Sequence, residues 1–246
     1  MPANNRIPFA AEGPFRQDRA GSIKDDPLLD RVTALAAGED GVALALVYDT
    51  SGSMKEPART VDGKQAAKWI IGNRALEQII HRIQKFATSS VPARTIHAGL
   101  YVFRGTSSAE AVTFAPWNAS AMLNWVKQYP GPNSGTPLGA TIDLASRALL
   151  NSRFTQKHIL VVTDGINTSG PDPTVVVPKI NKASESKGSP IFIHFVAFDI
   201  DAKVFAPLKK LGVTVVGAVD EKQLGQQLEF ILEEKILLEK EAPTKK

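Results

Sequence analysis

The sequence predicts an α/β fold in which a mostly parallel, doubly wound sheet is covered by helices on both faces. Continuous apolar runs of strand length recur along the chain, and segments with apolar residues at helical spacing lie between them. Apolar runs without polar alternation are typical of strands that are buried on both faces. Strands that alternate with helices form parallel sheets. The composition, 43% hydrophobic and 22% charged over 246 residues, is that of an ordinary globular protein.

The first core strand is expected at residues 42–48, an unbroken apolar run that ends at Asp49. The same pattern returns in four later runs, at residues 96–103, 159–162, 191–198 and, in a shorter form, 213–216. Residues 110–114 follow the second run after a loop, RGTSSA, that is too short for a crossover connection. These two strands are therefore expected to form an antiparallel hairpin at one edge of the sheet.

Helical spacing of apolar side chains predicts three helices. The spacing recurs in residues 64–87 (Leu76, Ile79, Ile80, Ile83 and Phe86), 138–149 (Leu138, Ile142, Ala145 and Leu149) and 224–238 (Leu224, Leu228, Ile231 and Leu232). The last helix is expected to pack its apolar face on the sheet. Its charged side chains are expected to stay in solvent; they are Glu229, Glu233, Glu234, Lys235 and Glu239.

Both ends of the chain are expected to lie outside the domain. Residues 1–38 mix Pro, Gly and both charges with little periodicity, apart from a short helical spacing at residues 28–35, and predict a partly irregular N-terminal arm. Residues 39–240 would form the domain. Residues 241–246, EAPTKK, would form a solvated tail.

The composition excludes several kinds of site. The chain has no cysteine, so disulfides, thiolate metal sites, cysteine nucleophiles and iron–sulfur clusters are excluded, and any metal must be held by oxygen or by histidine. The four histidines, His81, His97, His158 and His194, lack metal-binding spacing and are interpreted as structural. The net charge of +4 is spread along the chain without a run of basic residues, so nucleic-acid binding is not expected.

The sequence also bears on location. No stretch approaches the roughly 18 apolar residues of a membrane-spanning helix, and the N-terminus lacks a basic segment followed by a long apolar one. These observations predict no membrane span and a cytoplasmic location, with an extracellular location as the alternative if the chain is a truncated form. They give no indication of the oligomeric state.

A carboxylate and two hydroxyls, from Asp49, Ser51 and Ser53, follow the first strand at alternate positions. Alternation at a turning strand end directs all three oxygens toward one point. Oxygen-only clusters suit hard cations, above all Mg²⁺, which accepts few carboxylates and keeps several waters. The same residue types also make a good turn after a strand. On their own, residues 49–54 are therefore consistent with either a cation site or a plain turn.

Two further segments add oxygens near this strand end. Asp164 follows the run at residues 159–162, and in a doubly wound sheet that strand lies beside the first one at the topological switch point. Asp49 and Asp164 are therefore expected to face each other across a crevice. Thr136 stands before Pro137 and an amphipathic helix, where it is either another oxygen ligand or the N-cap of that helix.

In order and spacing, these residues resemble the complete metal-ion-dependent adhesion site of the von Willebrand factor type A family. The resemblance rests on Asp49-x-Ser51-x-Ser53, on Thr136 in a Gly-Thr-Pro-Leu context and on Asp164-Gly at a strand end, and it covers about residues 40–236. It implies a six-stranded sheet in the order 3-2-1-4-5-6 with strand 3 antiparallel. The chain departs from the family pattern in a longer stretch, residues 55–63, before the first helix.

The resemblance also implies a role for each site residue. Ser51, Ser53 and Thr136 would bind Mg²⁺, or Mn²⁺ or Ca²⁺, directly through their hydroxyls, and Asp49 and Asp164 would act mainly through bound water. The remaining coordination position would be left for an acidic group of a partner protein. Because the three direct ligands are neutral, the ion retains affinity for one more anionic oxygen.

The expected function is therefore divalent-cation-dependent binding of another protein. The rim that would contact the partner is expected at residues 55–62, 104–108, 133–135 and 166–172, because these segments follow or neighbour one sheet edge. Nothing in the sequence pairs a nucleophile with a base, so an enzyme, a hydrolase included, is disfavoured. Two other contexts stay open: an accessory subunit of an AAA+ ATPase of the chelatase or MoxR type, and a scaffold in a larger assembly.

Overall fold

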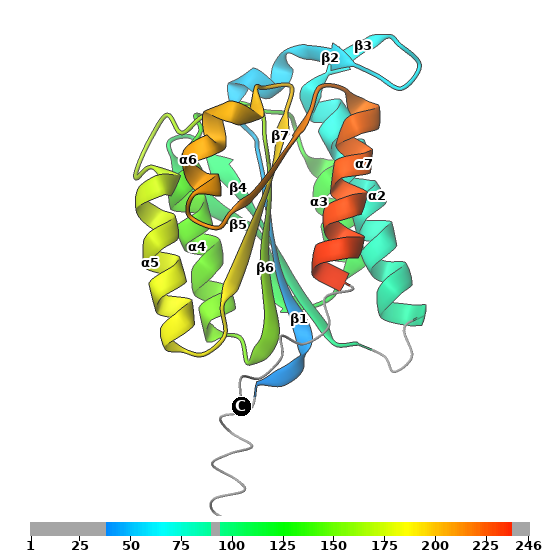
Figure 1. The fold of residues 1–246 in the computed structure, drawn as a ribbon. Coiled ribbons are helices and arrows are strands. Elements are labelled where there is room, and N and C mark those ends of the chain that lie inside the picture. The colour runs from blue at the N-terminus through cyan, green and yellow to red at the C-terminus, as the bar shows by residue number, and fades with distance from the viewer. Residues whose placement is uncertain (1–37, 90–93, 238–246) are drawn as a thin grey trace, which may run out of the picture. The chain divides into compact units, whose positions relative to one another are not determined.

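The computed structural model describes residues 38–89 and 94–237. The predicted arm at residues 1–38, apart from Gly38, and the predicted tail at residues 241–246 lie outside the described residues. Within residues 38–89 and 94–237, a six-stranded sheet lies between two layers of helices (Figure 1). None of the helices in these ranges is long and apolar enough to cross a membrane.

The strands of the main sheet follow the order β5-β4-β1-β6-β7-β8. Their bounds are Glu39–Tyr48 (β1), Ile96–Arg104 (β4), Ser107–Pro116 (β5), Phe154–Thr163 (β6), Ile191–Phe198 (β7) and Thr214–Ala218 (β8). All neighbouring pairs are parallel except β4 and β5. Numbered along the chain within this sheet, the order is 3-2-1-4-5-6 with the third strand antiparallel, so the predicted sheet is confirmed. β1 is central, with Leu44 opposite Ala98 of β4 and His158 of β6.

The hairpin at the sheet edge is tighter than predicted. Arg104 of β4 pairs with Ser107 of β5, so only Gly105 and Thr106 join the two strands. Gly105 has a φ of 60°, a left-handed conformation that glycine adopts at little steric cost. The strand pairing therefore continues through most of the segment that was predicted to be a loop.

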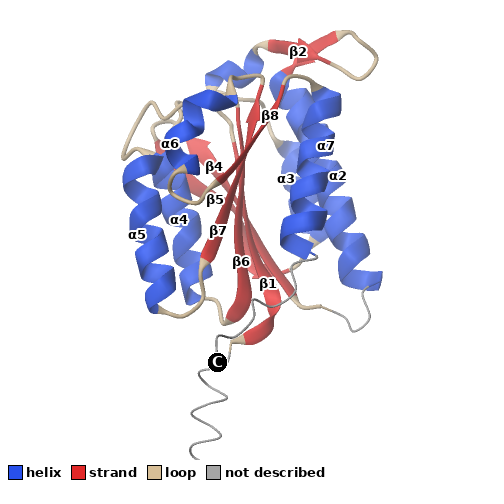
Figure 2. Cartoon of the chain, in the orientation of Figure 1, coloured by secondary structure: helices blue, strands red, loops and turns tan. Residues whose placement is uncertain are grey.

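Helices cover both faces of the sheet. Their bounds are Lys68–Ser89 (α2), Ala119–Gln128 (α3), Leu138–Asn151 (α4), Pro173–Ser186 (α5), Ala206–Lys209 (α6) and Glu221–Ile231 (α7), with short 3₁₀ helices at Gly52–Lys55 (η2) and Ala202–Phe205 (η3) and a π-helical segment at Leu232–Leu237 (η4). In Figures 1 and 2, α2, α3 and α7 lie on one face and α4, α5 and α6 on the other. The prediction of a sheet covered on both faces is confirmed.

Three of these helices, α3, α5 and the four-residue α6, were not predicted. In α5 the interior Pro178 disfavours a helix, yet the burial of Val176, Val177 and Ile180 against the sheet holds the segment in place. α3 is short, and its clearest sequence signal is the cap, because the Asn118 side chain accepts a hydrogen bond from the backbone N–H of Ala121 at 2.9 Å.

The start of α2 corrects the predicted helix at residues 64–87. The helix begins at Lys68, and the residues before it form β3 (Gln65–Ala67), which pairs antiparallel with β2 (Pro57–Arg59). The longer stretch before the first helix thus folds as a small β-hairpin, which lies beyond the carboxyl edge of the main sheet (Figure 1). Backbone pairing in the hairpin satisfies groups that a first helical turn would leave without partners.

The last predicted helix is present but changes type. α7 is α-helical to Ile231, and η4 continues it as a π-helix with Leu232, Ile236 and Leu237 buried. On the opposite side, Glu229 and Glu233 are half-exposed and both pair with Arg82 of α2. The expected division into an apolar face and a solvated charged face is confirmed for this part of the helix.

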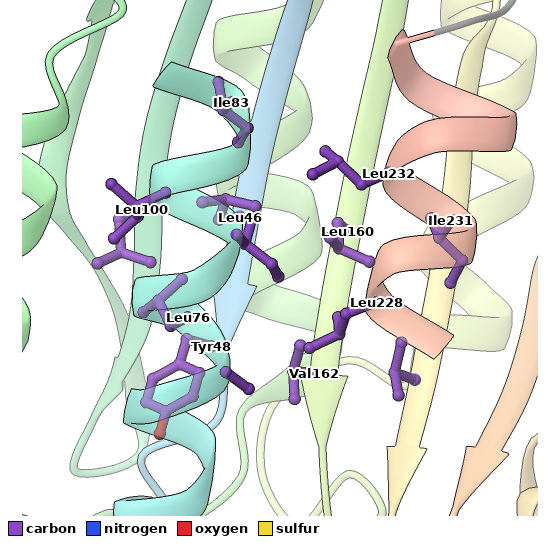
Figure 3. Close-up of a cluster of buried hydrophobic side chains, with 14 of the residues drawn as sticks. Leu46, Tyr48, Leu76, Ile83, Leu100, Leu160, Val162, Leu228, Ile231 and Leu232 are labelled. Carbon is purple, nitrogen blue, oxygen red and sulfur yellow. The ribbon is translucent and has the colours of Figure 1, made fainter. Parts of the chain in front are cut away.

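The core between the sheet and α2 and α7 contains a large cluster of buried apolar side chains (Figure 3). Leu46 and Leu160 lie on adjacent strands and pack with Leu76 of α2 and Leu228 of α7, each at most 5% exposed. Burying one such side chain contributes roughly 1.5–3 kcal/mol relative to leaving it in water. The carboxyl edge of the sheet is therefore held in place by packing.

Two of the four histidines form a buried pair on adjacent strands. His158 Nδ1 of β6 lies 3.2 Å from His194 Nε2 of β7. Burial lowers the pKa of His158 to about 3 and that of His194 to about 4, with a further contribution from the neighbouring ring for His158 and from Lys235 for His194. Both rings are therefore neutral at pH 7, as expected of structural histidines.

Candidate metal centre

The candidate site lies where β1 and β6 end side by side at the carboxyl edge of the sheet. Tyr48 and Val162 are paired in the parallel register, and the backbone N–H of Asp49 donates to the carbonyl of Val162 at 3.0 Å. The chain then turns away from the sheet on both strands. This is the topological switch point, where ligands bind in open α/β sheets.

Asp49 is fully buried and is held by two neutral donors. Its Oδ1 accepts a hydrogen bond from the backbone N–H of Ser51 at 2.7 Å, and its Oδ2 accepts from Thr163 Oγ1 at 2.6 Å. The first bond is the one that a plain Asp turn would make. The second joins the ends of β1 and β6 and fixes the direction of the carboxylate.

A chain of oxygens continues from Ser51 to Asp164. Ser51 Oγ lies 2.9 Å from Ser53 Oγ, and Ser53 Oγ donates to Asp164 Oδ1 at 2.8 Å. Two strand ends that are more than 100 positions apart in the sequence are thereby connected through side-chain oxygens. The prediction that the strands ending at Asp49 and Asp164 lie side by side is confirmed.

Thr136 reaches the same place from a third segment. Its backbone N–H donates to Thr168 Oγ1 at 2.8 Å, and its carbonyl accepts from the N–H of Thr168 at 2.9 Å. A Cβ placed on Gly165 would lie 3.7 Å from Thr136 Oγ1 and 3.8 Å from Ser53 Oγ. Both hydroxyls therefore lie over the backbone that follows Asp164.

The alternative role of Thr136 as a helix cap is wrong. The N-cap position of α4 is occupied by Pro137, and no side chain caps it there. Instead, the free N–H of Gly139 donates to Asn167 Oδ1 at 3.1 Å. The β6–α5 loop thus satisfies the helix end, which leaves the Thr136 side chain available to the site.

The oxygen spacing suits a small hard cation. With Mg–O bonds of about 2.0–2.1 Å in an octahedron, neighbouring ligand oxygens lie roughly 2.9 Å apart. The Ser51 and Ser53 hydroxyl oxygens, which are 2.9 Å apart, have this spacing. Among residues 38–89 and 94–237, no three His, Asp or Glu side chains are grouped to hold a metal. A cation bound here would therefore depend on the hydroxyls.

The two carboxylates of the site have different electrostatic surroundings. Burial and then the nearby charge of Asp164 raise the pKa of Asp49 to about 6, although its hydrogen bonds from Ser51 and Thr163 act in the opposite direction. The ionised form of Asp49 is therefore costly in the metal-free protein, and a bound cation would relieve that cost.

Lys68 is a residue of this site that sequence reasoning missed. Its side chain is 4% exposed, and its Nζ lies 3.2 Å from Asp164 Oδ2, 3.0 Å from Glu56 and 3.1 Å from Asp199. Burial alone would lower the pKa of the Lys68 ammonium, but Glu56, Asp164 and Asp199 outweigh it, so the pKa lies above its usual value. The only sequence signal is a lysine inside the largely apolar segment AAKWII.

Three of the predicted rim segments are hydrogen-bonded to one another around the site. The N–H of Gly135 donates to the carbonyl of Gly105 at 2.9 Å, and Ser169 Oγ donates to the carbonyl of Thr106 at 3.4 Å. The fourth segment, residues 55–62, contains β2. The four segments together surround the carboxyl edge of the sheet.

Comparison with known proteins supports the fold. The family model described as "von Willebrand factor type A domain" matches residues 43–226. No curated protein sequence matches the chain.

Similar solved structures include pilus proteins. The PilB minor pilin from Streptococcus sanguinis has a TM-score of 0.61 at 15% identity, over 80% of this chain and 61% of the pilin, so the chain spans less than two thirds of that protein. The vWF domain of the type V pili tip protein Mfa5 from Porphyromonas gingivalis has a TM-score of 0.60 at 11% identity, over 79% of this chain and 95% of that one. The VWA domain of SpRpn10 has a TM-score of 0.54 at 11% identity, over 76% and 93%.

At these identities the structural likenesses show the fold alone. The family profile extends from the first core strand into α7 and includes all five predicted site residues. The chain therefore belongs to the von Willebrand factor type A domain family.

Proposed function

We propose that the chain binds a partner protein through a divalent cation, with Mg²⁺ as the first candidate and Mn²⁺ or Ca²⁺ as alternatives. Ser51, Ser53 and Thr136 would hold the ion through their hydroxyls, and Asp49 and Asp164 would support it, mainly through water. The bound ion supplies positive charge at the carboxyl edge of the sheet. An acidic side chain of the partner completes its coordination.

The observation that carries this proposal is the oxygen chain from Ser51 through Ser53 to Asp164, with separations of 2.9 and 2.8 Å. A plain turn needs only the bond from the Ser51 N–H to Asp49, and it does not require the Ser53 hydroxyl to contact a carboxylate on another strand. The Ser51–Ser53 separation is that of neighbouring ligands on a magnesium ion, and the hydrogen bond from Ser53 places the Asp164 carboxylate next to one of these proposed direct ligands.

The charge of the site favours an acidic partner group. Asp49 and Asp164 are the carboxylates that accept hydrogen bonds from Ser51 and Ser53, and Asp164 is also paired with Lys68. A divalent ion held in this way keeps net positive charge and prefers one further anionic oxygen. Exposed basic residues on the rim, Lys55 and Arg104, add long-range attraction to an acidic surface.

The proposed activity is binding without catalysis. Two of the structural neighbours are named as a minor pilin and as a pilus tip protein, and these names favour a role in protein assembly or adhesion. The cytoplasmic location expected from the sequence stays a prediction, as do the ATPase-partner and scaffold contexts.

Selection of random displayed peptides on the immobilised domain tests the proposal. Peptides are retained in millimolar Mg²⁺ and eluted with EDTA. We expect every enriched peptide to contain Asp or Glu, and we expect replacement of that acid by its amide to lower affinity by at least about tenfold, which is about 1.4 kcal/mol.

The domain offers matched variants for this selection. Thr136→Ala should lose the EDTA-eluted peptides, whereas Gln78→Ala, in the middle of α2 and nearly three helical turns from Lys68, should retain them. Peptides that stay bound in EDTA, or that tolerate the change from acid to amide, would show that recognition does not pass through a metal.

A further inference from the structure

Lys68 places a fixed positive charge directly behind the candidate metal site. Its ammonium contacts carboxylates from three separate elements: Glu56 after η2, Asp164 at the end of β6 and Asp199 at the end of β7. Asp164 is the one whose side chain is fully buried, whereas the side chains of Glu56 and Asp199 are 65% and 37% exposed. The pair with Asp164 is therefore the one least screened by water.

The two oxygens of Asp164 have different partners. Oδ1 accepts the hydrogen bond from Ser53 Oγ at 2.8 Å, and Oδ2 accepts from Lys68 Nζ at 3.2 Å. In contrast, both oxygens of Asp49 accept from neutral groups. Lys68 thus engages one oxygen of Asp164 and offsets the charge of only one of the two carboxylates.

The ammonium is held in place from two sides. The N–H of Lys68 donates to the carbonyl of Glu56 at 2.8 Å, just beyond the pairing of Pro57 with Ala67 that closes the β2–β3 hairpin. On the other side, Asp199 has a φ of 53°, in a region that few residues other than glycine adopt. The extra hairpin of this chain and the turn after β7 both bring a carboxylate to Lys68.

We infer that Lys68 weakens the hold of the site on its cation, and so leaves more of the charge of the ion for the carboxylate of the partner. This inference rests on the proposed function. Asp49, Asp164, Glu56 and Asp199 together carry a charge of −4, and Lys68 reduces the charge of this cluster to −3. A unit positive charge within several ångströms of a divalent ion changes its affinity on the order of tenfold even under water-like screening.

Binding of Mn²⁺ to the purified protein, measured by electron paramagnetic resonance of the free ion, tests the inference. Lys68→Met removes the charge and keeps an apolar stem, and we expect it to bind Mn²⁺ about tenfold more tightly than the wild type. Lys68→Arg keeps the charge and should restore weak binding. Lys64→Met removes a charge from the hairpin, where Lys64 pairs with Asp62 at the surface, and should leave the affinity unchanged.

Lys68→Met leaves three carboxylates without their cation, so this variant could fail to fold. A second pair of variants keeps the inference testable in that case. Lys68→Met combined with Asp199→Asn is balanced in charge and is compared with Asp199→Asn alone, each checked by circular dichroism. We expect the double variant to bind Mn²⁺ more tightly than the single one. Equal or weaker binding by the folded double variant would overturn the inference.

The outcomes separate this inference from the proposed function. If the wild type binds Mn²⁺ and loss of Lys68 does not tighten binding, the inference fails and the proposed function stands. If neither the wild type nor any folded Lys68 variant binds Mn²⁺, the metal site itself is wrong and the inference falls with it. Binding that appears only after loss of Lys68 would support the inference directly.

Discussion

Thr163 Oγ1 donates a 2.6 Å hydrogen bond to Asp49 Oδ2 and so connects the last residue of β6 with the first residue after β1. This contact sits beneath the proposed ligands and involves neither of the serines. It makes the direction of the Asp49 carboxylate depend on the neighbouring strand.

Thr163→Val removes this donor at nearly constant side-chain volume. The ionised Asp49 loses one of the two hydrogen-bond donors described above, so we expect the free energy of unfolding at pH 7 to fall by about 1–2 kcal/mol and Mn²⁺ binding to weaken several-fold. Urea unfolding and Mn²⁺ titration measure the two effects. Thr113→Val, at an exposed position of β5, is the control and should change neither.

Asp49→Asn should stabilise the metal-free protein at neutral pH. The folded-state pKa of Asp49, about 6, lies above its unfolded value of 3.8, so its stabilising contribution is complete below pH 3.8 and is lost as the pH rises through 6. At pH 7 the wild type carries the full cost of ionising this carboxyl, and we expect the variant to be about 1–3 kcal/mol more stable.

Urea unfolding in EDTA at pH 4 and at pH 7 checks this prediction. The difference between Asp49→Asn and the wild type should be small at pH 4 and appear at pH 7. The variant should also lose stabilisation by added Mg²⁺. A variant that is less stable than the wild type at pH 7 would contradict the conclusion that ionisation of Asp49 costs stability in the metal-free protein.

Thr136→Ala should reduce cation binding while leaving the fold intact. We expect the wild type to bind Mg²⁺ with a dissociation constant on the order of 10⁻⁴ to 10⁻³ M, as sites of low ligand charge do. Loss of the hydroxyl should weaken this by about tenfold in calorimetric titration. The backbone hydrogen bonds between Thr136 and Thr168 do not involve this hydroxyl, so the thermal unfolding midpoint in EDTA should stay close to that of the wild type.

The buried histidine pair predicts a loss of stability in acid. The folded-state pKa values of His158 and His194, about 3 and 4, lie below the unfolded value of 6.5. The unfolded chain therefore takes up protons that the native state does not, and stability falls as the pH drops from 6.5 toward 4. His194→Leu should make this fall shallower in urea unfolding between pH 4 and 7, whereas His81→Leu on α2 should leave it unchanged.

Most of the main sheet could be predicted from the sequence because β1, β4, β6 and β7 are buried on both faces. Such strands appear as unbroken apolar runs, as at residues 42–48. The helices were harder to predict. α5 carries Pro178 and consecutive valines, so its helical state depends on packing against the sheet, which no local pattern records.

Part of the candidate site could be predicted because its residues lie in short sequence motifs at the ends of predictable strands. Asp49, Ser51 and Ser53 are close in sequence, and Asp164 ends a strand whose place in the sheet follows from the fold. The contacts of Lys68 depend on the β2–β3 hairpin, whose strands are three residues each and carry no apolar alternation. A buried lysine placed by such a short element leaves almost no trace in the sequence.

The π-helical segment η4 has a consequence for the tolerated length of the chain. Its buried side chains repeat every five positions, Ile231 with Ile236 and Leu232 with Leu237, whereas Leu224 and Leu228 in α7 repeat every four. Removing one of the charged residues 233–235 would restore a spacing of four and return the same apolar side chains to the core as an ordinary α-helix. This stretch is therefore a point where a one-residue deletion is compatible with the fold, although it lies inside a regular element.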